Sequence, residues 1–111
     1  MKMYKKITAL ALVLLTYSAA SSAAEGTITQ VITRIQYDGA GDQTYLVGPS
    51  KWGAPSCVNA TYGWIPNSVL GRKQILAIAL AAQASGKRMS LVGNCHTNKD
   101  YFVVTYVYII N

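Results

Sequence analysis

The stretch SVLGRKQILAIALAAQASG, Ser68–Gly86, is the one segment after the N-terminus with the pattern of a long amphipathic helix. Ser68 is placed to cap its first turn, with Asn67 as the alternative, and Gly86 to end its last turn. A broad apolar stripe runs along the segment, formed by Ile75, Ile78, Ala79 and Ala82 and flanked by Leu76 and Leu80. This width predicts burial against a sheet plus a second contact, made either with another subunit or with one end of a barrel. The candidate residues of a subunit interface are Ile75, Leu76 and Leu80.

Three strands are predicted before this helix. Thr27–Tyr37 alternates and is rich in β-branched residues, which is typical of a long, half-buried strand. The glycine-rich segment Asp38–Asp42 predicts a turn into a second strand at Gln43–Val47. Its two aspartates lack the ligand order of a calcium loop, so a hairpin turn is the better interpretation. A short third strand is expected at Cys57–Tyr62.

Two further strands are predicted after the helix, at Lys87–Val92 and Tyr101–Ile110, separated by the polar turn Gly93–Asp100. The last strand is apolar on both faces, which indicates a central strand or one at an interface. The sequence therefore predicts a mainly β domain with one helix, in the order β-β-β-α-β-β. This is the element order of the five-stranded OB-fold barrel.

Residues 1–24 have the organisation of a secretory signal peptide, with basic residues before the apolar run Ile7–Leu15 and small residues after it. The run is shorter than the roughly 20 residues that span a bilayer. Cleavage after Ala24 is preferred over cleavage after Ala23 because Glu25 then opens the mature chain. We therefore expect a periplasmic or secreted protein with a single domain at 25–111 and no membrane span after signal removal.

Cys57 and Cys95 both fall in this mature domain. Outside the cytoplasm they are expected to pair with each other, closing a loop whose ends are 38 residues apart (95 minus 57). Such a crosslink contributes on the order of 3–4 kcal/mol. A metal site or a catalytic thiol is the weaker interpretation because there is no CxxC motif and only one histidine, and no cofactor motif is present.

The charge of the chain does not indicate a nucleic-acid partner. Its formal net charge is +6, but three of the ten Lys and Arg residues precede residue 25. Seven basic residues then face four acidic ones, which gives +3 for the mature chain, and the basic residues form no dense run. An OB-fold nucleic-acid binder using Arg34, Tyr37 and Tyr45 is therefore a minor alternative.

The chain resembles the exported, pentamer-forming B subunits of AB5 toxins, above all the subtilase-cytotoxin and pertussis-like branch. The resemblance covers Cys57–Val92 and is carried by Cys57, by Trp64 before the helix, and by the SGKRMSL stretch Ser85–Leu91. It implies an OB barrel, self-association, and recognition of a glycan or a surface receptor without catalysis. The longer interval from Trp64 to the helix end and the presence of Cys95 depart from that family.

Sugar recognition requires aromatic faces together with hydroxyl, amide or carboxylate groups. The candidate ligand residues are Asp42, Tyr45, Trp52, Asn59, Tyr62, Asn98 and Lys99. Trp52 lies in a loop, where an indole either closes a small core or contacts a ligand, and both roles stay open.

Two other functions remain as alternatives. A small periplasmic inhibitor or immunity-type protein would bind an enzyme through a loop such as Gly48–Ser56. A hydrolase would need His96 as its general base, with Asp100 and Thr97 as neighbours, but the sequence contains no nucleophile-elbow, zinc or paired-carboxylate motif.

Overall fold

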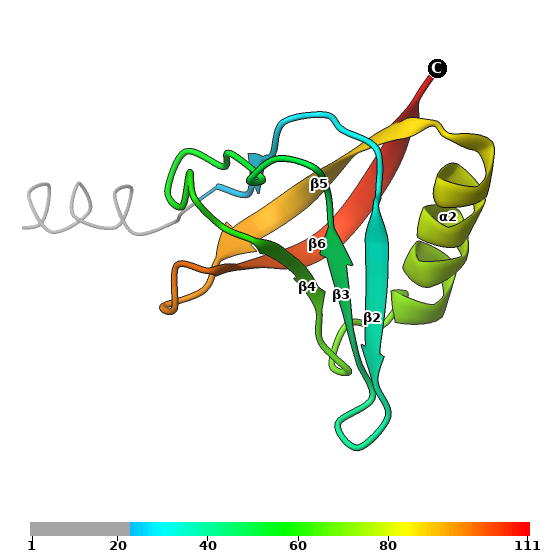
Figure 1. The fold of residues 1–111 in the computed structure, drawn as a ribbon. Coiled ribbons are helices and arrows are strands. Elements are labelled where there is room, and N and C mark those ends of the chain that lie inside the picture. The colour runs from blue at the N-terminus through cyan, green and yellow to red at the C-terminus, as the bar shows by residue number, and fades with distance from the viewer. Residues whose placement is uncertain (1–22) are drawn as a thin grey trace, which may run out of the picture.

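The computed structural model describes residues 23–111, so the expected signal peptide lies outside the described residues except for Ala23 and Ala24. Within these described residues seven elements follow one another (Figure 1): β1 (Glu25–Gly26), β2 (Arg34–Asp38), β3 (Gln43–Val47), β4 (Tyr62–Ile65), α2 (Arg72–Ser85), β5 (Arg88–Cys95) and β6 (Tyr101–Ile110). The second and last predicted strands, at Gln43–Val47 and Tyr101–Ile110, are confirmed with the expected bounds.

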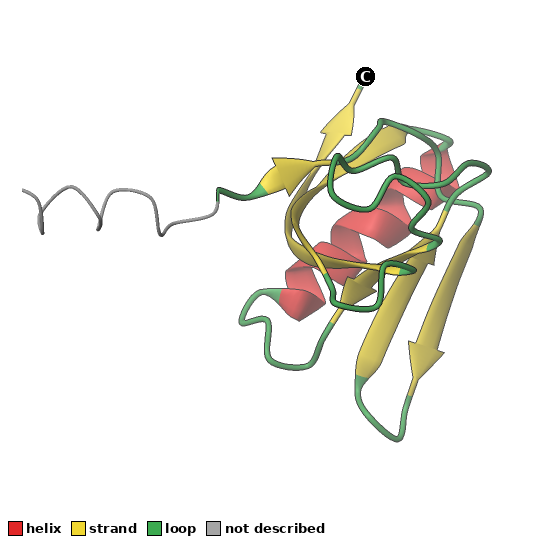
Figure 2. Ribbon diagram, turned by 90° about the vertical axis from the view of Figure 1, so that its left-hand side faces the viewer, coloured by secondary structure: helices red, strands yellow, loops and turns green. Residues whose placement is uncertain are grey.

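All six strands belong to one sheet in the order β1-β5-β6-β4-β3-β2. Neighbours pair antiparallel except β4 and β6, which pair in parallel. The sheet twists strongly, so that β5 and β6 cross the direction of β2 and β3 (Figure 1), and α2 lies on one side of it (Figure 2). A mainly β domain with one helix is thus confirmed. The sheet has six strands rather than five and is not closed into a barrel, which differs from the expected architecture.

The expected long strand Thr27–Tyr37 is wrong as a single element because the chain changes partners along it. Its first part bonds to β5, through the amide of Thr27 and a bridge at Gln30, whereas the amide of Thr33 donates to β3. The Gln30 side chain is buried and makes two hydrogen bonds with the backbone of Ser50, of 2.9 and 3.0 Å. These bonds hold the chain in place where it leaves β5 and begins to pair with β3.

The third strand lies at β4 rather than at the expected Cys57–Tyr62. The residues around Cys57 hydrogen-bond within their own loop: the Cys57 amide donates to Ala54 O and the Ala60 amide donates to Cys57 O. Because these groups are satisfied locally, the segment does not enter the sheet. The fourth strand is longer than expected and continues through Cys95.

The helix starts later than predicted. Gly71 is its N-cap residue, with no side-chain cap, because the residues after β4 form a turn in which the Val69 amide donates to Pro66 O. Its end is confirmed: Gly86 adopts the left-handed conformation, with φ of 67°, and so closes the last turn.

The core fills the space between the curved sheet and α2. Trp52 is completely buried, and its indole N–H donates to Leu46 O at 3.0 Å. Leu91 reaches from β5 over Gly63 on β4 so closely that a Cβ on the glycine would lie 2.4 Å from its Cδ1. From the helix, Ile75, Ala79 and Ala82 enter this core.

The expected disulfide between Cys57 and Cys95 is confirmed, with the two Cα atoms 5.9 Å apart. Glu25 packs beside it: its carboxylate accepts hydrogen bonds from the Ser56 amide at 2.9 Å and from the Ser56 hydroxyl at 2.8 Å. The first residue of the expected mature chain is therefore bonded to the disulfide-bearing loop.

Gly93 is the glycine with the least space for a side chain. It lies at a register shift between β5 and β6, and a Cβ there would be 1.8 Å from Val103 O. We expect Gly93→Ala to cost about 2 kcal/mol or more, because only backbone movement relieves the clash. Urea unfolding measures this as a lower transition midpoint. Gly26→Ala, whose Cβ meets only Leu91 O at 4.0 Å, should leave the midpoint nearly unchanged, and equal midpoints for the two variants would contradict the prediction.

Candidate functional site

Aromatic side chains gather on the outward face of β3, β4 and β6. Along each strand they alternate with core residues, so that Gly63 and Ile65 are buried while Tyr62 and Trp64 are partly exposed. We call the set Tyr45, Tyr62, Trp64, His96 and Tyr101 the aromatic face; His96 joins it from the turn after β5.

The strand register brings these rings together. Tyr45 is paired directly with Trp64, and Tyr62 with Tyr101. The Tyr62 and Tyr101 rings stack, with centroids 5.2 Å apart and an angle of 20° between their planes, and Tyr45 meets Tyr62 edge-on at 5.8 Å. A stacked pair of this kind contributes about 0.5–1.5 kcal/mol beyond its buried area.

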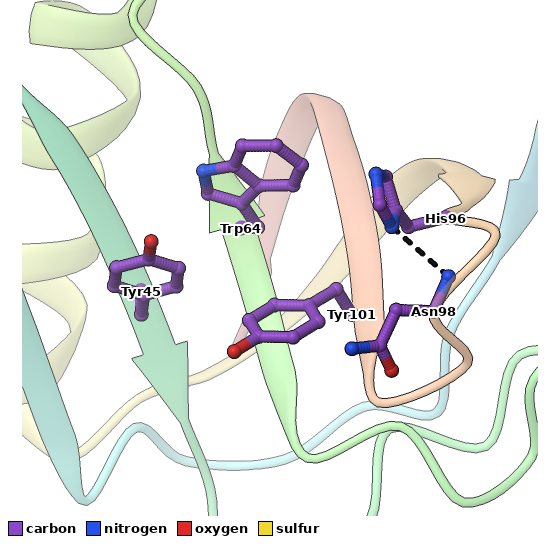
Figure 3. A pocket seen from close by; sticks show the side chains of 5 residues that line it. All are labelled: Tyr45, Trp64, His96, Asn98 and Tyr101. Atoms are coloured by element: carbon purple, nitrogen blue, oxygen red, sulfur yellow. Dashed lines mark hydrogen bonds between the residues drawn. The ribbon is translucent and has the colours of Figure 1, made fainter. Parts of the chain in front are cut away.

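Tyr101 also forms a corner with the two remaining rings, Trp64 and His96. Trp64, His96 and Tyr101 have pairwise centroid distances of 5.3, 6.1 and 6.4 Å and interplanar angles of 77°, 69° and 78°. The three ring planes are therefore nearly perpendicular to one another. With Tyr45 and Asn98 they line a depression of about 140 Å³ (Figure 3), which we call the first depression.

Hydrogen bonds hold the polar groups of this depression in place. His96 Nδ1 accepts from the Asn98 amide at 3.0 Å, so Nε2 carries the proton of the neutral ring. Asn98 Oδ1 accepts from the Asp100 amide at 3.2 Å, which leaves its Nδ2 group as a donor. The Trp64 indole N–H donates to Gln43 Oε1. The turn and the indole are thus fixed before any ligand arrives.

A second depression of about 210 Å³ adjoins the first. It is lined by Gln36, Tyr45, Tyr62 and Tyr101, so that Tyr45 and Tyr101 border both depressions. Burial raises the pKa of Tyr45, and the neighbouring Tyr101 and Asp38 raise it further. Its hydroxyl therefore stays protonated at neutral pH and can donate a hydrogen bond.

The structure separates the sequence-predicted ligand residues into two groups. Tyr45, Tyr62 and Asn98 line the two depressions. Trp52 lies in the core, so its indole closes the core rather than contacting a ligand. Asn59 and Lys99 are exposed and lie outside both depressions.

Four lining residues were not proposed as ligand residues from the sequence: Gln36, Trp64, His96 and Tyr101. Trp64 had been placed before the helix rather than in a strand. Tyr101 belongs to a run that is apolar on both faces, which hides its outward orientation. The sequence does not reveal that Tyr62 pairs directly with Tyr101, because this pairing depends on the parallel register of β4 and β6.

Asp42, the remaining predicted ligand residue, has a structural role. Tyr37 donates to its Oδ1 at 2.8 Å, and the guanidinium of Arg72 lies 3.1 Å from its Oδ2. The Tyr37 hydrogen bond, assisted by Arg72, lowers the pKa of Asp42. These contacts join the β2–β3 turn to the first residue of α2.

Glu25, Cys57 and Cys95 are the one group among residues 23–111 whose ligand atoms lie close enough together to suggest a metal site, all within 4.8 Å of one another. Both sulfurs belong to the disulfide, however, and the thiolates that bind metals are therefore not available in the oxidised protein. We assign this group a structural role.

Comparison with known proteins gives no relative: no protein-family model, curated protein or solved structure matches the chain. The resemblance to toxin B subunits therefore stays a hypothesis. In the part of the chain that the structure describes, no helix combines the length and apolar character needed to cross a membrane.

We predict that Asp42→Asn abolishes an acid-sensitive part of the stability. Since the folded pKa of Asp42 lies below its ordinary 3.8, its charge stabilises the fold above that value, and the contribution is lost as pH falls through the folded pKa. Asn also tolerates the left-handed backbone at this position, where φ is 51°. The melting temperature of the wild type should exceed that of the variant at pH 7 and approach it at about pH 2. A constant difference across this range would contradict the assignment.

Proposed function

We propose that this protein is an exported, non-catalytic module that binds carbohydrate through its aromatic face. The observation that carries the proposal is the corner of three near-perpendicular rings, Trp64, His96 and Tyr101, next to hydrogen-bonding groups that are held in place. A sugar ring is not flat and presents C–H groups on its faces with hydroxyl groups around its edge. It can contact several walls of such a corner while its hydroxyls bond to Asn98 and Tyr45.

The ring geometry favours a sugar over a nucleobase. A base is flat and requires an open, parallel platform on which to stack. In the one stacked pair of the aromatic face, Tyr62 and Tyr101 cover one face of each other, so a base cannot insert between them without separating the two rings. The modest +3 charge after residue 24 also gives little attraction for phosphates.

The fold and the disulfide support the same proposal. Taking β1 and β2 as two parts of one strand that bonds β5 and then β3, the strand order, the parallel β4–β6 pair and the position of α2 agree with an OB-fold. OB-folds bind oligosaccharides and oligonucleotides on strands corresponding to β3 and β4. The disulfide is consistent with export to the periplasm or beyond.

The inhibitor alternative receives less support because the loop Gly48–Ser56 is held against the domain. Its Trp52 is buried, and Gln30 bonds to the backbone of Ser50. For the hydrolase alternative, no carboxylate, serine or cysteine is among the described residues that line the depression containing His96. Both observations favour binding on the aromatic face.

Tyr101→Ala should weaken glycan binding at least about tenfold, because this ring borders both depressions and stacks on Tyr62. Tyr106→Ala is the matched control: it removes a ring that is 56% exposed from the same strand but lies outside both depressions. Affinity would be measured by titration calorimetry with a sugar selected on a glycan array, after circular dichroism shows that both variants fold. Equal affinity in the two variants would remove the aromatic face as the site.

We also propose that the protein self-associates through the outward side of α2. Leu80 is 49% exposed there, next to exposed alanines. Of the expected interface residues, Leu80 remains and Leu76 is half-buried. Ile75 is a core residue and is dropped from the interface.

Leu80→Glu should convert an oligomer into a monomer, because it puts a charge into the proposed apolar contact. Light scattering coupled to size exclusion gives the molar mass of the oxidised protein. The control is Gln74→Glu, which adds the same charge at an exposed polar position of the same helix and should leave the mass unchanged. A monomeric wild type at every concentration would refute this interface without affecting the proposed sugar site.

A further inference from the structure

The two depressions of the aromatic face are neighbouring sites with a shared boundary. Tyr45 and Tyr101 line both, with ring centroids 6.0 Å apart and planes inclined by 60°. Beyond this boundary the surroundings differ: Trp64 and His96 lie on one side, and Gln36 and Tyr62 on the other. A ligand that crosses the two tyrosines therefore meets a mainly aromatic site and then a more polar one.

Neither depression is large enough alone for an extended ligand. Their volumes are about 140 and 210 Å³, whereas pockets for drug-sized ligands span about 300–1,000 Å³. Only together do the two reach the lower end of that range. This favours one small ring in each depression, with the linkage between the rings passing over Tyr45 and Tyr101.

The lining has no permanently charged group. Of the described residues that line the two depressions, none carries a carboxylate, an ammonium or a guanidinium group. Asp38 lies near enough to act electrostatically on Tyr45, which disfavours an anion at the boundary. Arg34 follows the same alternation on β2, two residues before Gln36, but lies outside both depressions.

We propose that the aromatic face recognises a neutral oligosaccharide through two subsites, one sugar unit in each depression. This inference rests on the proposed carbohydrate function and adds to it the charge and the minimum length of the ligand. Tyr45 and Tyr101 contact both units. Asn98 selects the unit in the first depression, and Gln36 selects the unit in the second.

A glycan array carrying neutral and acidic glycans, from single sugars to tetrasaccharides, tests the proposal with the mature, oxidised protein. We expect retention of neutral glycans of two or more units, with the corresponding single sugars bound at least about tenfold more weakly, since they lose one subsite. Equal binding of a single sugar, or a requirement for a carboxylate or sulfate group, would overturn the two-subsite inference while leaving the carbohydrate function intact. Binding to no glycan at all would overturn both.

Two variants on the exposed strand β2 sharpen the result. Gln36→Ala should weaken binding of the selected oligosaccharide and leave binding of its single-sugar unit in the first depression unchanged. Arg34→Ala, a matched control on the same strand, should alter neither affinity. Loss of binding in Arg34→Ala, with Gln36→Ala unaffected, would show that the site recognises an anion instead. Both residues are exposed, so both variants should fold like the wild type.

Discussion

The parallel pairing of β4 with β6 is the constraint on which the rest of this structure depends. It brings Tyr62 beside Tyr101 across 39 residues of chain (101 minus 62), and a parallel pair needs a crossover connection. Here the crossover contains α2 and β5. The helix is therefore more than a cover for the core, because it returns the chain so that β6 can lie against β4. Without that register, the two tyrosines would not stack and neither depression would form.

Several contacts along other strands hold this arrangement in place. Cys57 lies ahead of β4 and Cys95 at the end of β5, so that the disulfide ties the loop before one partner of the parallel pair to the strand beside the other. Glu25 bonds to the same loop through Ser56. Gly93, by lacking a side chain, allows β5 to approach β6 at the register shift. The part of the fold that bears the proposed site is thus also the part with covalent and steric support.

The sequence predicted those features that are local or chemically selective. Tyr101–Ile110 and Gln43–Val47 have strand propensity along their whole length, and Gly86 ends the helix by backbone conformation. The expectation of export made pairing of Cys57 with Cys95 the simplest prediction. The third strand was misplaced because tight hydrogen bonds around Cys57 outweigh its local strand propensity. The aromatic face was only partly predicted, since Tyr101 becomes a site residue through a strand partner distant in sequence.

The two faces of β4 differ in a way that supports the proposed binding role of the aromatic face. Its inward residues, Gly63 and Ile65, already meet the needs of the core, where Gly63 leaves room for Leu91. The outward residues of the same strand, Tyr62 and Trp64, are only partly covered by their neighbours. Polar side chains at those two positions would satisfy the same strand pairing and leave less apolar surface in water. The gathering of these partly exposed rings beside polar groups that are held by hydrogen bonds therefore supports the proposal that a ligand contacts them.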